Sequence, residues 1–193
     1  MATAEARRRG LADLFRRNLR THLPYRCTYV LTRQASTSTS TRAIEAVATV
    51  TIRPPGGVPV SLATMVRRGL VPFVVRNGPL AVKRLLALMK AYDEIEAQMA
   101  RGQSHRLVHM MAVTPPEQGR GLGTRLLDEA LALSTRASGD PRLPVLLTTH
   151  KEANVVFYRK LGFAVADERQ LALPGAPAYP VWSMRRPIPG QAQ

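Results

Sequence analysis

Three glycines within five residues are the feature that most constrains this chain. They are Gly119, Gly121 and Gly123, and they lie between a hydrophobic run and a helical pattern. Glycine adopts backbone conformations that other residues avoid, and it lets other groups approach the chain closely. The first N–H groups of a helix lack partners within the helix and favour an anion. Residues 118–123 therefore predict a site for a phosphate-bearing ligand.

The spacing of these glycines excludes two common nucleotide-binding motifs. A P-loop needs Gly-Lys-Ser/Thr, whereas Gly123 is followed by Thr124 and Arg125. A Rossmann fingerprint needs the spacing G-x-G-x-x-G, which this loop does not have. The phosphate-bearing ligand is therefore held by another kind of loop.

The composition describes a folded chain with an aliphatic core. The 193 residues are 45% hydrophobic and 5% aromatic, which suits one domain or one domain with extensions. Cys27 is the single cysteine, so no intrachain disulfide or cysteine-based zinc site is expected, and we predict no metal site. No apolar stretch reaches the roughly 18 residues of a membrane span. The single cysteine suits a reducing compartment, and we expect the protein to be located in the cytoplasm.

The strong positive charge leaves several interpretations open. The formal charge is +15, which suits nucleic acid, anionic lipid or phosphorylated ligands, or a solvated arginine-rich surface. Residues 1–42 contain nine arginines and two acidic residues. They predict a basic amphipathic helix over 5–23, a strand over 27–32 and a Ser/Thr-rich loop over 35–41. A mitochondrial presequence has a similar composition, so a mitochondrial location is the alternative.

Helical and strand patterns alternate through the rest of the chain. This alternation predicts an α+β fold of the layered α/β kind with a mixed sheet. A short helix near 61–72 is ambiguous. The expected strands span 46–52, 107–113, 145–149 and 181–184, with another beginning at 163–165, and the expected helices span 79–99, 122–136 and 152–161. We expect a basic N-terminal segment over 1–42, a main domain over 43–187 and a tail over 188–193.

Two blocks, taken together, resemble the GNAT acetyltransferase superfamily. The first is Gln118-x-x-Gly121-x-Gly123, which is similar to that superfamily's loop for the pyrophosphate of acetyl-coenzyme A. The second is Asn154-x-x-Phe157-Tyr158-x-x-x-Gly162-Phe163, about 30 residues on. The resemblance covers about residues 45–186.

Within the superfamily, the chain most resembles puromycin N-acetyltransferase-like members. The motifs that carry this resemblance are residues 52–56, the basic helix near 82–90, His105 and residues 182–185. The strand and helix that open such members are not identifiable here.

The resemblance implies a mostly antiparallel central sheet flanked by helices, with acetyl-coenzyme A as co-substrate. It implies an N-acetyltransferase that modifies the amine of a small molecule by direct transfer, as a monomer or a homodimer. The expected cofactor-binding residues are Met111, Ala112, Val113, Gln118, Gly119, Arg120, Gly121, Leu122, Gly123, Thr124, Asn154 and Tyr158. Lys151, Arg159 and Lys160 are further candidates for a phosphate contact, against the alternative of a solvated face.

Tyr158 and His109 are the expected catalytic residues. The resemblance implies that Tyr158 protonates the leaving thiolate and that a backbone N–H near Val113 stabilises the oxyanion. No Asp or Glu lies near this strand in the sequence, so His109 is the candidate base, four residues before Val113 and thus expected on the same face. The alternatives are a packed Tyr158, a packed His109 with direct attack, and Asn154 as a helix cap.

Two other functions remain open at this stage. The acceptor could be a protein amine, either a lysine or an N-terminus. The fold could also serve a non-catalytic protein that binds nucleic acid or the ribosome through its basic N-terminal helix, although aromatic residues suited to base stacking are scarce.

Overall fold

The structure is a computed structural model that describes residues 5, 12, 15–17, 19–35, 43–58 and 70–187. The predicted loop over 35–41 and the ambiguous segment over 61–69 lie almost entirely outside these ranges. Within the predicted helix over 5–23, the described residues 15–17 and 19–22 are helical, and the 3-10 turn η1 (Leu23–Tyr25) follows. Cys27 is buried immediately before the first strand.

Six strands form one sheet in the order β1-β2-β3-β4-β6-β5. All neighbouring strands are antiparallel except β3 and β4, which are parallel. The predicted mixed, mostly antiparallel sheet is therefore confirmed. The strands are β1 (Thr28–Ala35), β2 (Ala43–Arg53), β3 (Arg106–Val113), β4 (Val145–Thr149), β5 (Ala164–Leu171) and β6 (Tyr179–Arg186).

In the part of the chain from residue 70 onward, the helices that flank this sheet are α3 (Leu70–Ala100), α4 (Leu122–Ser138) and α5 (Glu152–Lys160). A backbone kink at Gly78, with φ 76° and ψ 170°, interrupts α3 immediately before Pro79, where the sequence predicts a helix to begin. The 3-10 turn η2 (Pro115–Glu117) joins β3 to the glycine loop. Among the described residues, no helix is both long enough and apolar enough to cross a membrane.

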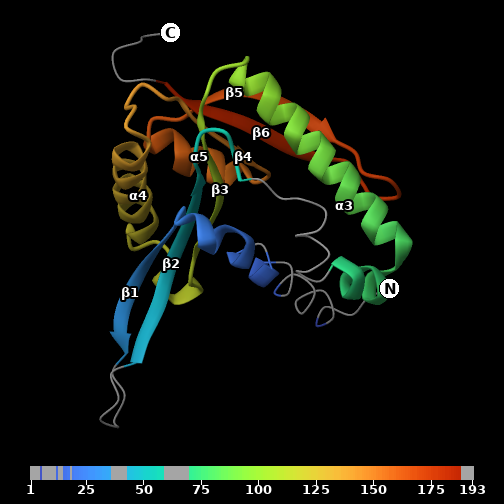
Figure 1. The fold of residues 1–193 in the computed structure, drawn as a ribbon, viewed down its shortest axis with the longest axis horizontal. Helices are drawn as coiled ribbons and strands as arrows, with labels where there is room; N and C mark the ends of the chain where they lie inside the picture. Colours follow the sequence, from blue (N-terminus) through green and yellow to red (C-terminus); the bar gives the residue numbers. More distant parts are fainter. Residues whose placement is uncertain are drawn as a thin grey trace.

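The two faces of the sheet are covered by different helices (Figure 1). On one face, Leu127 of α4 and Val155 of α5 pack in the cluster that contains Leu147 of β4. On the other face, Ile95 of α3 packs in the cluster that contains Leu146 of β4. Successive residues of β4 thus point to opposite helical layers, as strand geometry requires.

A β-bulge in β3 changes which residues face each layer. Thr51 of β2 pairs with Met110 and the next residue, Ile52, pairs with Val108, so His109 is an extra residue in β3. An extra residue shifts the alternation of the side chains beyond it. Val108 and, beyond the bulge, Met111 consequently both pack in the α4 layer, although they are three residues apart.

The parallel pair β3 and β4 separates after a short contact. Only Arg106–Val108 pair with Val145–Leu147. Beyond this point β3 keeps its pairs with β2 as far as Val113, and β4 keeps its pairs with β6 as far as Thr149. The two strands therefore diverge into a gap in the middle of the sheet.

Candidate functional site

The glycine loop leads directly from the end of β3 into the N-terminus of α4. Gly119 and Gly121 have φ values of 78° and 74°, a region that favours glycine. Gly121 is the N-cap of α4, with no side chain capping the helix, and its carbonyl accepts from the N–H of Arg125 at 3.1 Å. The N–H groups of residues 122–124 precede this first helical bond and have no intrahelical acceptor. These groups form the expected anion site.

Gly123 has a different role, because neighbouring side chains occupy the space that a side chain at this position would need. A Cβ atom there would lie 3.0 Å from Met111 Cε, 3.4 Å from Val113 Cγ2 and 3.5 Å from Phe157 Cζ. Only a residue without a side chain lets α4 approach β3 and α5 this closely. The absence of a side chain therefore brings together three elements that the sequence assigned to the cofactor site.

Gln118 ties the glycine loop to β3. Its Nε2 donates a hydrogen bond of 3.0 Å to the Val113 carbonyl. In this structure, Gln118 therefore orients the loop relative to the last residue of the strand.

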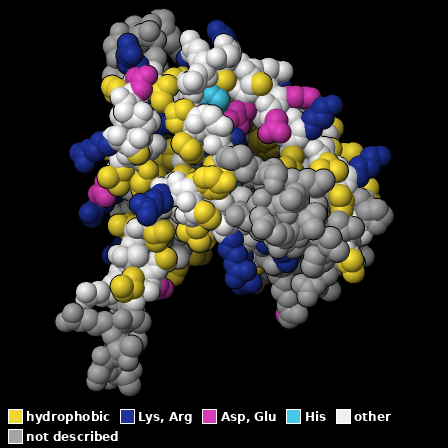
Figure 2. Space-filling view, viewed as in Figure 1, with side chains coloured by type: hydrophobic (Ala, Val, Ile, Leu, Met, Phe, Trp, Pro, Cys, Tyr) yellow, Lys and Arg dark blue, Asp and Glu magenta, His cyan; other side chains and the backbone are white. Residues whose placement is uncertain are grey.

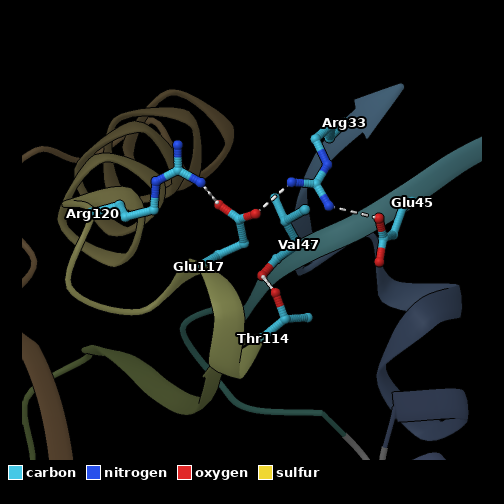
Figure 3. A network of polar contacts seen from close by, with 6 residues as sticks. All are labelled: Arg33, Glu45, Val47, Thr114, Glu117 and Arg120. Carbon is cyan, nitrogen blue, oxygen red and sulfur yellow. Dashed lines mark hydrogen bonds and ion pairs between the residues drawn. The ribbon is translucent and has the colours of Figure 1, made fainter. Parts of the chain in front are cut away.

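A chain of ion pairs holds Arg120, another residue expected to contact the pyrophosphate (Figure 3). Arg120 Nη1 donates to Glu117 Oε2 at 2.7 Å, and the Glu117 side chain is only 8% exposed. Arg33 of β1 donates to the other Glu117 oxygen and, at 2.9 Å, to Glu45. Because Arg33 also holds Glu117, this buried carboxylate keeps a cationic partner if Arg120 turns toward a phosphate.

The backbone of β3 presents N–H groups to the gap. The N–H of Thr114 donates to the Val47 carbonyl of β2 at 2.9 Å. Because backbone groups alternate along a strand, the N–H groups of Val113 and Met111 point away from β2 and into the gap. The same alternation directs the N–H of Ala112 toward β2. Val113 and Met111 are therefore the β3 amides that can meet an oxyanion or a ligand amide.

Tyr158 lies on α5 in an aromatic cluster. Its ring centroid is 5.0 Å from that of Phe157 and 5.7 Å from that of Phe163, in edge-to-face arrangements. Burial raises the pKa of Tyr158 to about 12. The hydroxyl is therefore protonated at neutral pH and can donate a hydrogen bond.

Asn154 does not cap its helix. The N-cap of α5 is Lys151, without a side-chain cap, and Asn154 lies three residues into the helix. Its Nδ2 instead donates to Thr149 Oγ1 at 2.9 Å. This bond fixes the start of α5 to the end of β4, beside the gap.

His109 does not share a face with Val113, so that expectation was wrong. The bulge at His109 reverses the alternation, and Val113 packs in the α4 layer. The imidazole of His109 instead lies 4.7 Å from the ring of His22 and near the charges of Arg53 and Glu96. The i, i+4 rule fails because it assumes an unbroken strand.

The surroundings of His109 make it a weak base. Part of the side chain is open to solvent, but desolvation by the packed protein lowers its pKa to about 4, with smaller contributions from His22 and Arg53. The ring is therefore neutral at pH 7. Its low pKa also makes proton acceptance unfavourable there.

Glu96 is an acidic residue near β3 that the sequence analysis missed. It lies on α3, and its Oε1 is 2.9 Å from Nε2 of His105, while Oε2 is 3.2 Å from Arg53 Nη1. Burial alone would raise the pKa of Glu96, but His105 and Arg53 outweigh it and lower that pKa. The same bond to Glu96 raises the pKa of His105. Glu96 lies outside the strand pattern, on the preceding helix, and the packing of α3 brings it to His105 and to Arg53, which is 43 residues away.

A second group missed from the sequence lies at the end of β4. Tyr92 Oη of α3 is 3.0 Å from His150 Nδ1, and the His150 ring is 5.6 Å from that of Tyr179 of β6. His150 directly follows β4. A histidine at the end of a predicted strand was the available sequence signal. Within the described residues, no group of three or more His, Cys, Asp or Glu side chains is placed to hold a metal ion.

Comparison with known proteins identifies the domain. Residues 83–165 match the family model described as the acetyltransferase (GNAT) domain. A search of curated proteins finds no match. The predicted GNAT-type domain is thus confirmed, and with it the class of acetyl-coenzyme A-dependent N-acetyltransferase.

Solved structures share the fold at low sequence identity. A histone acetyltransferase HPA2 and related acetyltransferase from Corynebacterium glutamicum matches with a TM-score of 0.54 at 15% identity, covering 100% of this chain and 82% of that chain. The polyamine N-acetyltransferase of Drosophila melanogaster matches with 0.53 at 18%, covering 96% and 81%. The apo form of an agmatine N-acetyltransferase mutant matches with 0.55 at 18%, covering 88% and 80%.

The packing around Gly123 predicts that a branched side chain there is destabilising. Gly123→Val forces atoms into space held by Met111, Val113 and Phe157, and we expect it to lower the free energy of unfolding by about 1–3 kcal/mol. Urea unfolding measures this loss. The matched control is Thr124→Val, one residue on and exposed, which we expect to change stability by less than about 0.5 kcal/mol. Equal effects of the two substitutions would contradict the close packing.

The Glu96–His105 pair predicts a pH-dependent stability. His105 has a higher pKa in the folded state than in the unfolded state, so its protonation stabilises the fold. This stabilisation is complete below the ordinary histidine pKa of 6.5 and is lost as the pH rises through the pKa of His105 in the folded state. Glu96 has a lowered pKa, so its contribution fades only as the pH falls below its ordinary value of 4.5. We expect His105→Gln to cost about 1–2 kcal/mol at pH 6 and clearly less at pH 9, measured by urea unfolding. An equal loss at both pH values would rule out the charged pair.

Proposed function

We propose that this chain, which carries a GNAT acetyltransferase domain, transfers the acetyl group of acetyl-coenzyme A to the primary amine of a small molecule. One observation carries the proposal: the gap between β3 and β4 opens beside both the N-terminus of α4 and the start of α5. An anion site, strand amides directed into the gap and the helix that carries Tyr158 thus border one opening. The four short motifs that resemble puromycin N-acetyltransferases support the subtype as a further proposal.

Each part of the cofactor has a matching part of the chain in this proposal. The N–H groups of residues 119–124 and the Arg120 guanidinium suit the pyrophosphate. The backbone of Met111–Val113 suits the amides of the pantetheine arm. Tyr158 suits the thiol end, because α5 packs against Gly123 and against the end of β4.

The residues around the gap supply what amide formation from a thioester needs. The N–H of Val113 stabilises negative charge on the thioester oxygen as the amine attacks. Tyr158 donates to the sulfur as the C–S bond breaks. Its pKa of about 12 is well above that of an ordinary thiol, about 8.5, so it acts first as a hydrogen-bond donor and completes the proton transfer only as charge builds on the sulfur.

The α3 helix favours a small acceptor over a polypeptide. It packs on β4 and β6 through Ile95 and Met99, and it brings Tyr92 to the end of β4. This helix lies along the face of the sheet opposite to α4 and α5 (Figure 1). In this proposal, an extended peptide approaching the gap from that face would meet α3, whereas a compact amine would not need to cross this helix.

On one face, the described basic side chains are arranged as on a solvated surface. Among the described residues on the face in Figure 2, Lys and Arg side chains are spread over the surface and not gathered into one patch. A nucleic-acid site uses a basic patch or stripe. On this face, the charge is better explained as a solvated basic surface.

Binding and turnover together test the function. We expect 1 mM acetyl-coenzyme A to raise the Tm by several degrees, because a ligand at 100 times its Kd adds about 2.7 kcal/mol to stability. Adenosine at the same concentration is the control, since it lacks the pyrophosphate and the pantetheine arm. Thiol release is then measured with a panel of spermidine, agmatine, phenethylamine and a tripeptide with a free N-terminus. No shift, or no amine-dependent thiol release, would refute the enzyme, and release with the tripeptide alone would refute a small acceptor.

The role of Tyr158 is tested by removing its hydroxyl. We expect Tyr158→Phe to lower kcat about 100-fold, the usual effect of losing a general acid, while KM for acetyl-coenzyme A changes less than about threefold. Tyr29→Phe on β1 is the matched control. That residue packs against the α4 layer away from the gap, and its loss should leave kcat unchanged. An unchanged kcat in Tyr158→Phe would remove this residue from the mechanism.

A further inference from the structure

Tyr92, His150 and Tyr179 form a cluster of titratable groups to which the mechanism has so far given no role. The three side chains come from α3, from the end of β4 and from the start of β6. Tyr92 and Tyr179 are half-buried, whereas His150 is exposed. An accessible imidazole is thus held between two packed phenols.

The position of His150 relates it to the gap. Val108 and Leu147 form the last pair between β3 and β4, and His150 lies three residues beyond Leu147. Met111, whose N–H points into the gap, lies three residues beyond Val108 on the other strand. Since a strand advances about 3.3 Å per ladder position, His150 is about 10 Å past the point of separation. Because His109 is a bulge residue, Met111 is only two ladder positions past Val108, about 7 Å, and Val113 is four, about 13 Å. His150 is therefore at a similar depth to the amides that receive the thioester.

The two sides of the gap carry different groups. Thr149 points toward α5, where it accepts from Asn154, and the next residue, His150, points toward α3, where it meets Tyr92. Tyr158 lies in the α4 and α5 layer. A base on the α3 side and an acid on the α5 side would thus act on opposite sides of the reacting carbon.

The contacts of the cluster suit the His150 tautomer that is protonated on Nδ1. Tyr92 Oη is 3.0 Å from Nδ1 and 3.4 Å from Nε2 of His150, so Nδ1 is the closer partner. Tyr92 also interacts with Tyr179, and burial together with Tyr179 raises the pKa of Tyr92, which keeps it a neutral phenol. Tyr92 can then accept from Nδ1–H of His150 and donate its own proton to Tyr179. In this arrangement, Nε2 carries the lone pair.

His150 suits proton acceptance better than His109 does. Burial lowers the pKa of His150, and no charged neighbour contributes to this shift. The pKa of His109 is lowered further, to about 4, by burial and by His22 and Arg53. Both rings are neutral at pH 7, but His150 lies at the end of β4 beside the gap, whereas His109 lies among His22, Arg53 and Glu96.

We propose that His150 Nε2 accepts the proton of the attacking amine, and that Tyr92 is the positioning residue that holds the imidazole. The proposal rests on the acetyltransferase function proposed above. The amine nitrogen forms a bond to the carbonyl carbon and gives one proton to Nε2, and the C–S bond breaks as Tyr158 supplies a proton to the sulfur. The imidazolium returns its proton to solvent and Tyr158 recovers one from solvent, so an amide and a free thiol are the products.

The experiment replaces His150 and His109 by alanine in separate variants and then adds free imidazole to each. We expect His150→Ala to lower kcat about 100-fold with the amine that gives the most thiol release in the panel, while the Tm shift from acetyl-coenzyme A stays that of the wild type. Added imidazole at 50 mM should raise the kcat of His150→Ala at least about tenfold, because it replaces the missing base. His109→Ala should change kcat less than about threefold and should not respond to imidazole. Tyr92→Phe should lower kcat about fivefold, with KM for acetyl-coenzyme A unchanged.

Three results would overturn the assignment. These are a wild-type kcat in His150→Ala, a loss of kcat that imidazole does not restore, and a loss restored by imidazole in His109→Ala instead. If the wild type itself transfers no acetyl group to any amine of the panel, the proposed function and this assignment both fail. If the wild type is active and His150→Ala matches it, the assignment alone fails.

Discussion

The separation of β3 from β4 is the constraint on which the rest of the site depends. The two strands pair over three residues only, and each then remains in the sheet through its other neighbour. Backbone N–H groups inside a sheet normally have a partner, so the amides of Met111 and Val113 at this opening are suited to a ligand. The glycine loop continues from β3 and α5 follows β4. The opening between the strands therefore also determines where the anion site and Tyr158 lie.

Two local features give the opening its geometry. The extra residue His109 in β3 shifts the alternation, so that Met111 and Val113 pack toward α4 while their amides point into the gap. Gly123 lets α4 come within contact distance of β3 and α5. Behind the loop, the buried carboxylate of Glu117 joins Arg120 to Arg33 of β1. The edge of the sheet thus supports the loop that is expected to hold the pyrophosphate.

Much of the fold could be predicted from local patterns. The β-branched and aliphatic runs predicted strands at 46–52, 107–113 and 145–149, and the structure has β2, β3 and β4 there. The apolar periodicity predicted α4 and α5, which begin within one residue of the expected positions. Such patterns are visible because each depends on residues only a few positions apart. The expected face of His109 was wrong because a bulge does not appear in a pattern of alternation.

The sequence by itself determined the glycine loop, the order of the elements and the block from Asn154 to Phe163, because short-range backbone preferences encode them. Only the tertiary structure decided which side chains surround the gap. Glu96 reaches Arg53, and Tyr92 reaches His150, because α3 packs across strands that lie far from it in the chain. Side-chain partners of this kind depend on register, on the bulge and on helix packing. These quantities are set by contacts between distant segments, and no local pattern in the sequence contains them.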